Sequence, residues 1–192
     1  MVPSRPDPDV VVAARLGEGW AFERLYEALS PVVLGYLRSQ GCVDAEAAVS
    51  EVFLRVFRKL GDFQGTESQL RSWVFTIAHN LLIDQRRMVS GRRADQPLHD
   101  RLDLPGGDVE DDAMARRGMG RVRQLLDLLP RDQRDVLLLR VVAELSLEEA
   151  AAAMDRTVGA VKALQHRALA SLRRRLQEVQ EIAPEAVSPR LS

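Results

Sequence analysis

The chain of 192 residues carries 27 Lys and Arg against 28 Asp and Glu, so its formal net charge is −1. Such a chain has little overall attraction for nucleic acid, and any DNA binding must depend on local patches or on a partner. Apolar residues make up 46% of the chain, enough to form one or two buried cores. Cys42 is the single cysteine, which excludes an internal disulfide and favours a reducing, cytoplasmic location. The sequence has no apolar run or signal-peptide pattern that would predict membrane insertion.

Helical periodicity dominates the first half of the chain, and clear period-two alternation is absent. Residues 10–41 predict one or two helices. Residues 43–60 show the clearest amphipathic pattern, with apolar side chains repeating at i, i+3 and i+4. A loop over 61–69 then precedes a second long helical pattern over 70–88. We expect these elements to form one helical domain, residues 1–93.

The composition changes after this domain. Residues 95–112 hold seven acidic residues against one Arg, together with two Pro and two Gly. Such a segment has too few apolar side chains to form a core, so we expect a flexible acidic linker over residues 94–114. A linker region of about 25 residues would span up to ~85 Å at ~3.4 Å per residue. That exceeds one and a half turns of duplex, ~50 Å, so two domains could bind separate parts of one DNA.

Helical periodicity returns at Met114 and predicts a second domain, residues 115–180, followed by a loose tail over 181–192. Residues 132–145 are apolar nearly all round, as expected for the central helix of a small bundle. The predicted fold class is therefore all-α, with two small helical domains joined by a flexible acidic linker.

Two short helical patterns with a break between them follow in the second domain. Ser146 and Glu149 have the spacing of a capping box at a helix start. Asp155 tolerates the left-handed backbone of a sharp turn, and Thr157 is a suitable N-cap for the next helix. This arrangement is typical of a DNA-reading helix-turn-helix, although a packed helical hairpin would show the same pattern.

The sequence offers little for catalysis. His79, His99 and His166 are far apart in the chain, and there is no metal-ligand spacing, no Gly-rich phosphate loop and no nucleophile motif. We therefore predict no enzyme activity, no metal and no cofactor. We interpret His79 as a surface or half-buried residue of a helix rather than as an acid–base group.

The second long helix carries a face with a different chemistry. Trp73, Thr76, Asn80 and Arg87 fall roughly in line, and Arg86 adds to a basic end. An aromatic ring, an amide and guanidinium groups can stack on an unpaired base, hydrogen-bond to its edge and hold phosphates. A core Trp beside a solvated charged face would give the same pattern, so this pattern alone leaves both interpretations open.

Two separate stretches resemble a known family. "DAEAAVSEVFLRVFRKLGDFQG" followed by "WVFTIAHNLLIDQRR" resembles region 2 of the extracytoplasmic-function (ECF, group 4) sigma factors of the bacterial sigma-70 family. "LLDLLPRDQRDVLLLRVVAELSLEEAAAAMDRTVGAVKALQHRALASLRRRL" is similar to their region 4, and "VKALQHRAL" is similar to actinobacterial members. The resemblance implies a sigma factor that binds core RNA polymerase and directs promoter-specific transcription initiation. The alternatives are a two-domain helix-turn-helix regulator that does not initiate transcription, and an interaction module with no DNA role.

The resemblance also implies which residues contact each partner. Docking on the β′ clamp helices of the polymerase would use Asp44, Glu46, Glu51, Phe53 and Arg55. The −10 promoter element would be opened and read by Asp62, Phe63, Trp73, Thr76, Asn80, Arg86 and Arg87. The −35 element would be bound in the major groove by Thr157, Gly159, Ala160, Lys162, Ala163, His166 and Arg167. Region 4 would also touch the β flap, the linker would approach the active-centre cleft, and an anti-sigma factor is a further candidate partner.

Several positions depart from the family pattern. The docking motif, often DAED followed by QE, has Ala47 and Ser50 at two of these places, so the clamp contact is either weaker or shifted to Glu46 and Glu51. An Arg often found in the recognition helix is replaced by Leu164, which fits a buried stripe. The promoter sequence does not follow from these residues.

Overall fold

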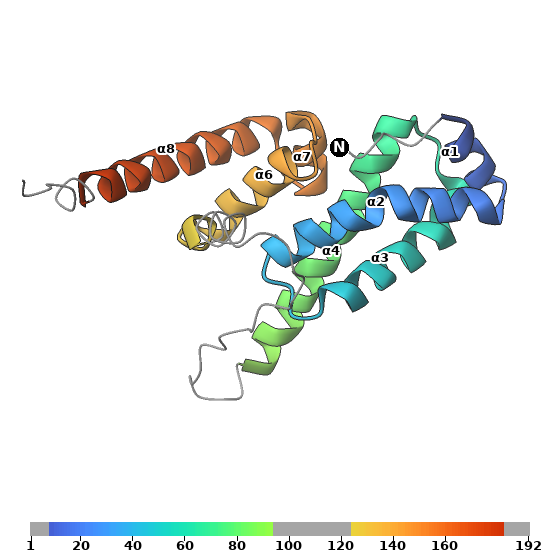
Figure 1. Ribbon diagram of the computed structural model, residues 1–192, viewed down its shortest axis with the longest axis horizontal. Helices are drawn as coiled ribbons and strands as arrows, with labels where there is room; N and C mark the ends of the chain where they lie inside the picture. The colour runs from blue at the N-terminus through green and yellow to red at the C-terminus, as the bar shows by residue number, and fades with distance from the viewer. Residues whose placement is uncertain (1–7, 94–123, 183–192) are drawn as a thin grey trace, which may run out of the picture.

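The computed structural model describes residues 8–93 and 124–182, and all regular elements in these two ranges are helices. Region 2, the first range, contains α1 (Pro8–Arg15), α2 (Gly19–Ser39), α3 (Ala45–Lys59), the short 3-10 helix η1 (Leu60–Asp62) and α4 (Glu67–Arg93) (Figure 1). Region 4, the second range, contains a helical turn at 124–127, α6 (Arg131–Val141), α7 (Leu147–Ala153) and α8 (Val158–Ile182). The predicted all-α fold is confirmed. The predicted linker 94–114 lies outside the described residues, as does the tail beyond residue 182.

The α3 helix illustrates how the sequence determines local structure. The side chain of Asp44 accepts a hydrogen bond of 2.9 Å from the backbone N–H of Ala47, which satisfies one of the unpaired donors at the helix start. Loss of such a cap costs about 1 kcal/mol. The buried residues of α3 share its apolar face and are Ala45, Ala48, Val49, Val52, Phe53 and Val56. The predicted amphipathic helix is therefore confirmed, beginning and ending within two residues of the predicted range.

Aromatic side chains fill the core of region 2. Phe22 of α2 lies against Phe57 of α3, with ring centroids 4.9 Å apart, and Tyr36 meets Phe75 of α4 edge-on at 5.5 Å. Edge-on and tilted arrangements of this kind add to the stabilisation from burial alone. The α2 helix continues without a break through Pro31. The sequence predicted one or two helices over residues 10–41, and the structure has two there, α1 and α2.

The two regions pack directly against each other. The α7 helix lies on α4, α6 touches α2, and one apolar cluster includes buried residues from both regions. In Figure 1, α6 and α7 lie beside the region 2 helices, and α8 extends away from them. The sequence predicted two domains and gave no indication of this contact.

The prediction for His79 was wrong, because the side chain is 2% exposed. Its Nδ1 atom lies 2.9 Å from the hydroxyl of Tyr36, and that hydroxyl accepts a bond of 3.4 Å from Nε2 of Gln40. The Tyr36 hydroxyl can therefore donate to a neutral imidazole. Burial lowers the pKa of His79 and Arg86 adds to this, while Asp135 and Asp132 act in the opposite direction. The fold thus favours the uncharged form of His79.

This lowered pKa makes stability depend on pH in a defined direction. The unfolded chain binds a proton at His79 more readily than the folded chain does. The free energy of unfolding therefore decreases as the pH falls below about 6.5, the ordinary pKa of histidine. We expect the melting temperature to fall between about pH 7.5 and about pH 5.5. The fall should be smaller in His79→Gln, as followed by circular dichroism. Parallel pH profiles for the two chains would contradict the assignment.

Candidate nucleic-acid interface

The outer face of α3 carries the polar residues predicted for docking. Oε1 of Glu51 lies 2.7 Å from Nε of Arg55 one turn along the helix, and Glu46 pairs with Arg38 of α2. The hydrogen bond from Arg38 lowers the pKa of Glu46, so this carboxylate stays charged. Exposed pairs of this kind stabilise a fold little, and their side chains are free to exchange partners. These groups suit a contact with another protein.

Phe53 does not belong to this polar face. Its side chain is 2% exposed and its ring lies 4.8 Å from that of Tyr26, at a steep angle. The structure therefore gives Phe53 a packing role, and truncation to Ala would cost about 3–5 kcal/mol of stability. The periodicity of α3 had already placed Phe53 beside Val49 and Val52.

A groove next to α3 contains residues that the sequence did not single out. It has a volume of about 540 Å³ and lies between the turn after α2, the start of α3 and the later turns of α4. Val43 and Met88 line it and are 81% and 68% exposed, although both are apolar. Apolar side chains exposed beside charged ones are typical of protein contacts. Single exposed residues in a turn and near a helix end leave no periodic signal in a sequence.

The start of α4 carries an aromatic stack. The rings of Phe63 and Trp73 lie nearly parallel, with centroids 5.0 Å apart, and both pack against the core. Gly65 allows this arrangement, because a Cβ atom built there would lie 2.3 Å from an atom of the Phe63 ring. Asp62 is exposed next to the stack. The structure thus brings the three predicted residues Asp62, Phe63 and Trp73 together.

The other predicted −10 residues continue along α4 with one exception. Thr76, Asn80 and Arg87 follow Trp73 at spacings that share one helix face, and Asn80 and Arg87 are exposed. The hydroxyl of Thr76 is occupied by the backbone oxygen of Ser72 at 2.9 Å. This face presents an amide and a guanidinium to solvent next to the aromatic stack.

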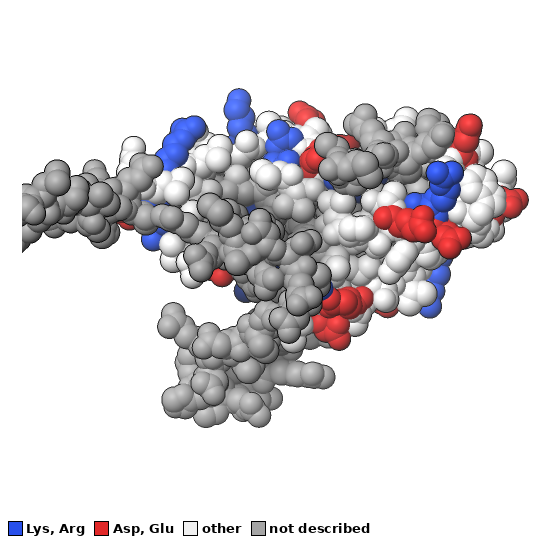
Figure 2. Space-filling model, in the orientation of Figure 1, with Lys and Arg blue, Asp and Glu red and all other residues white. Residues whose placement is uncertain are grey.

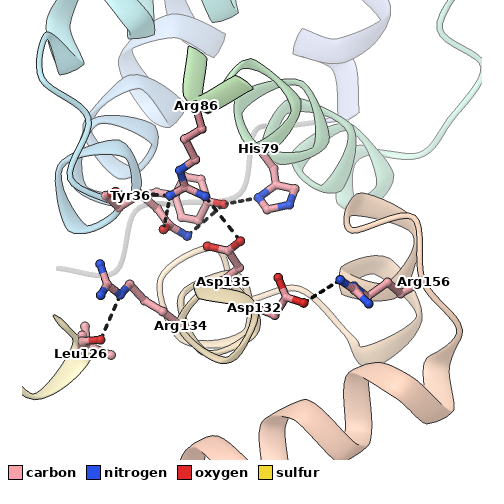
Figure 3. Close-up of polar contacts among 9 residues, drawn as sticks. Tyr36, His79, Arg86, Leu126, Asp132, Arg134, Asp135 and Arg156 are labelled. Atoms are coloured by element: carbon pink, nitrogen blue, oxygen red, sulfur yellow. Dashed lines mark hydrogen bonds and ion pairs between the residues drawn. The ribbon is translucent and has the colours of Figure 1, made fainter. Parts of the chain in front are cut away.

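Arg86 is the exception, because it points toward region 4 (Figure 3). Its Nη2 donates to Oε1 of Gln40 at 2.8 Å, and its Nη1 lies 3.5 Å from Oδ2 of Asp135. The side chain is 19% exposed. Arg86 therefore does not lie on the exposed face of Asn80 and Arg87, because a buried carboxylate from α6 holds it, and its contact with the −10 element stays a prediction.

The helix-turn-helix forms as the sequence predicts. Ser146 and Glu149 make both bonds of the capping box, at 2.7 and 3.1 Å. Asp155 has a φ of 51°, in the left-handed region, and Oγ1 of Thr157 accepts the N–H of Ala160 at 3.2 Å. Each of these contacts helps to fix the turn between α7 and α8.

One side of α8 faces solvent with the residues predicted to meet the −35 element. Gly159, Lys162, Ala163, His166 and Arg167 line a single shallow surface. Ala160 is half-buried, Thr157 caps the helix, and Leu164 faces the core as expected. In Figure 2, Lys and Arg side chains project from the α8 side of the molecule, whereas side chains of both signs lie over the region 2 helices. The nearly neutral net charge therefore does not exclude a locally basic surface on α8.

The described residues hold no helix that is long and apolar enough to cross a membrane. Within the same ranges there is also no group of three or more His, Cys, Asp or Glu side chains that could hold a metal ion.

Comparison with known proteins agrees with this architecture. Residues 22–92 match the model "Sigma-70 region 2", and residues 119–172 match "Sigma-70, region 4". The ECF RNA polymerase sigma factor SigD of Mycobacterium tuberculosis is 33% identical over 172 residues, which cover 85% of this chain and 81% of SigD. BldN of Streptomyces coelicolor, also an ECF sigma factor, is 32% identical over 88% of this chain and 66% of its own length. The chain therefore belongs to the ECF RNA polymerase sigma factors of the sigma-70 family.

Solved structures share the fold. CnrH, in complex with the cytosolic domain of CnrY, matches with a TM-score of 0.67 and 26% identity over 90% of this chain and 98% of CnrH. RpoE of Bartonella quintana, in complex with the anti-sigma factor NepR, also has a TM-score of 0.67, at 22% identity over 81% of this chain and 96% of RpoE. The second likeness supports the fold alone.

Proposed function

We propose that this chain binds core RNA polymerase in the cytoplasm, directs it to particular promoters and has no enzyme activity of its own. The observation that carries the proposal is the pairing of two different surfaces in one chain. Region 4 presents a capped helix-turn-helix with a solvent-facing basic side, and region 2 presents the aromatic stack and amide of α4. The first surface suits duplex DNA, and the second suits unpaired bases.

The −10 contact uses exposed and half-buried residues at the start of α4 and along one face of it. Asp62, Phe63 and Trp73 lie beside the place where an unpaired base would stack, and Asn80 offers both a donor and an acceptor to a base edge. Arg87 is exposed further along α4 and suits a phosphate. In this proposal Thr76 supports the face, because its hydroxyl is bonded to the helix backbone.

The −35 contact uses the exposed side of α8. Gly159 and Ala163 are small enough to let the helix approach the groove closely, while Lys162, His166 and Arg167 supply donors. Thr157 caps the helix start by accepting the N–H of Ala160, and the N-terminus of a helix favours a phosphate.

Docking on polymerase explains how a chain of net charge −1 can bind DNA. Asp44, Glu46, Glu51 and Arg55 would contact the β′ clamp helices, and region 4 would touch the β flap. Once one region is held on the polymerase, the other meets its DNA element at a high effective concentration. Few excess positive charges are then needed. An anti-sigma factor is a further candidate partner, since CnrH and RpoE were each solved with a bound partner protein.

The alternative, a helix-turn-helix regulator that acts without initiating transcription, leaves region 2 unexplained. Transcription by purified core polymerase on a promoter library, with and without the chain, separates these functions. A sigma factor produces chain-dependent transcripts from a subset of promoters. DNA binding with no chain-dependent transcript would support the regulator, and the absence of both would support an interaction module.

Glu51→Arg should weaken binding to core polymerase by about threefold to tenfold, because it replaces an attractive charge with a like charge at a basic partner surface. Helical content should stay unchanged, since Glu51 is 41% exposed at its side chain and makes only an i, i+4 pair. The matched control is Glu27→Arg, an exposed acid of α2. The docking assignment fails if titration of core polymerase gives the same affinity for the wild-type chain and Glu51→Arg.

Asn80→Ala should alter base preference at one −10 position by about 1–3 kcal/mol, because a bidentate contact to a base edge would be lost. Preference at the −35 element should hardly change, and the exposed position of Asn80 makes a folding defect unexpected. Transcription from single-base promoter variants measures both preferences. A uniform loss across all −10 variants would show that Asn80 does not read a base.

Lys162→Ala and Arg167→Ala should have different effects on binding to the −35 element. Lys162, one turn into α8 beside Gly159 and Ala163, is placed to reach a base edge, so its loss should relax −35 preference at one position. Loss of Arg167 should weaken binding to all −35 sequences evenly. It should also lower the slope of the logarithm of the binding constant against the logarithm of salt concentration by about one. Holoenzyme binding to −35 variants at two salt concentrations measures both effects, with Arg174→Ala further along α8 as the control. Identical behaviour of the two variants would remove support for this groove placement.

A further inference from the structure

Lysine is rare in this chain. Of the 27 basic residues two are Lys, Lys59 and Lys162, and the others are Arg. Both side chains are exposed, Lys59 in the last turn of α3 and Lys162 one turn into α8. A guanidinium group stays protonated and does not act as a nucleophile, whereas an amine can lose its proton and take an acyl group. Acylation of a side-chain amine is therefore limited to these two positions.

The surroundings of Lys162 leave its amine accessible. Within the described ranges its side chain has no hydrogen-bond or ion-pair partner, so acylation would break no contact of the fold. Gly159, one turn before it, has no side chain, and a Cβ atom built there would meet no atom within 4 Å. Ala163 adds only a methyl group to the shallow surface that these residues share. An acyl donor can thus approach the amine from the solvent side of α8.

An imidazole and a guanidinium lie next to this amine. His166 follows Lys162 by four residues on the same helix, a spacing that places two side chains side by side. Arg167 lines the same surface, and its Nε donates to the backbone oxygen of Ala163 at 3.3 Å. In the described part of the chain no carboxylate pairs with Arg167 or His166. An imidazole can accept the proton that an amine releases, and a guanidinium can hold a phosphate.

We propose that Lys162 is a site of acylation by acyl phosphates, in which Arg167 holds the phosphate and His166 accepts a proton. The amine nitrogen attacks the carbonyl carbon of the acyl group, and the bond from that carbon to the phosphate oxygen breaks. The nitrogen keeps the acyl group as an amide, and the proton that it loses passes to His166 and then to solvent. The products are an Nε-acyl-lysine and inorganic phosphate.

Acylation would change the chemistry of the α8 surface. It removes the positive charge of Lys162, leaves a single N–H donor in place of an ammonium group and adds an apolar acyl group. Under the proposed function, the modified chain loses the contact of Lys162 with the −35 element, and the supply of acyl phosphate regulates promoter binding. This consequence rests on the proposed function, whereas the acylation itself depends only on the side chains of α8.

Lys59 is the matched control within the same chain. It is exposed and has no ion-pair partner among the described residues, as is true of Lys162. Its helix neighbours are different. Four residues before Lys59 lies Arg55, already paired with Glu51, and four residues after it lies Phe63. Because neither neighbour can accept a proton from the amine, Lys59 should be acylated more slowly.

The experiment measures acetylation of the full chain by acetyl phosphate, with peptide mass mapping to give the rate at each lysine. Lys162 should react about tenfold or more faster than Lys59. His166→Gln should lower the rate at Lys162 to that at Lys59, because the proton acceptor is gone. Arg167→Ala should lower the rate with acetyl phosphate but not with acetic anhydride, an acyl donor without phosphate. Equal rates at the two lysines would overturn the proposal, as would an unchanged acetyl phosphate rate in either variant.

Holoenzyme binding to promoter DNA tests the consequence. In a Lys59→Arg background, acetylation should weaken binding to the preferred −35 element about fivefold or more. Lys162→Arg keeps a positive charge but offers no amine, so the same treatment should leave its binding unchanged. Fast acetylation of Lys162 with no effect on −35 binding would contradict the proposed role of Lys162 in DNA contact, while the measured rates would still support the modification site.

Discussion

Three sides of the α4 helix face the core of region 2, region 4 and solvent, and the rest of the molecule packs around this helix. Leu70, Val74 and Ala78 bury one side against α2 and α3. A second side packs against α7 and carries the Arg86 contact to Asp135 of α6, and a third carries Trp73, stacked on Phe63, and the exposed Asn80. Because a helix is rigid along its length, a shift of α4 would be transmitted to the core, to region 4 and to the exposed face around Asn80 together.

The distribution of charge follows from this arrangement. A strongly basic chain would bind DNA of any sequence. In this chain the positive side chains are confined to local surfaces, and some of them are bound to carboxylates or carbonyls of the chain itself. Arg71 meets the end of α6, Arg86 meets Asp135, and Arg38 meets Glu46. Lys162 and His166 of α8 remain exposed. Selectivity for polymerase-bound DNA is then a property of where the charges lie rather than of how many there are.

The sequence predicted the local structure well, because local rules decide it. The capping box at Ser146, the left-handed Asp155 and the cap at Thr157 all follow from neighbours within a few residues, and the structure confirms them. The sequence missed the burial of His79 and the internal contact of Arg86 for a common reason. Periodicity shows which residues share a helix face, but it does not show which distant element covers that face, and region 4 covers this one. Which residues contact polymerase and DNA still rests on the family resemblance and the exposed surfaces.

The loop between η1 and α4 has a consequence for exchanging parts among related chains. Phe63 stacks on Trp73 with the ring planes 27° apart, and a Cβ at position 65 would lie 2.3 Å from the Phe63 ring, so these three positions, in the loop and on α4, depend on one another. A loop grafted from a relative with a larger residue at position 65 would push the ring away and uncover the indole. Chimeras that exchange this loop therefore need to transfer the glycine and both aromatic residues together.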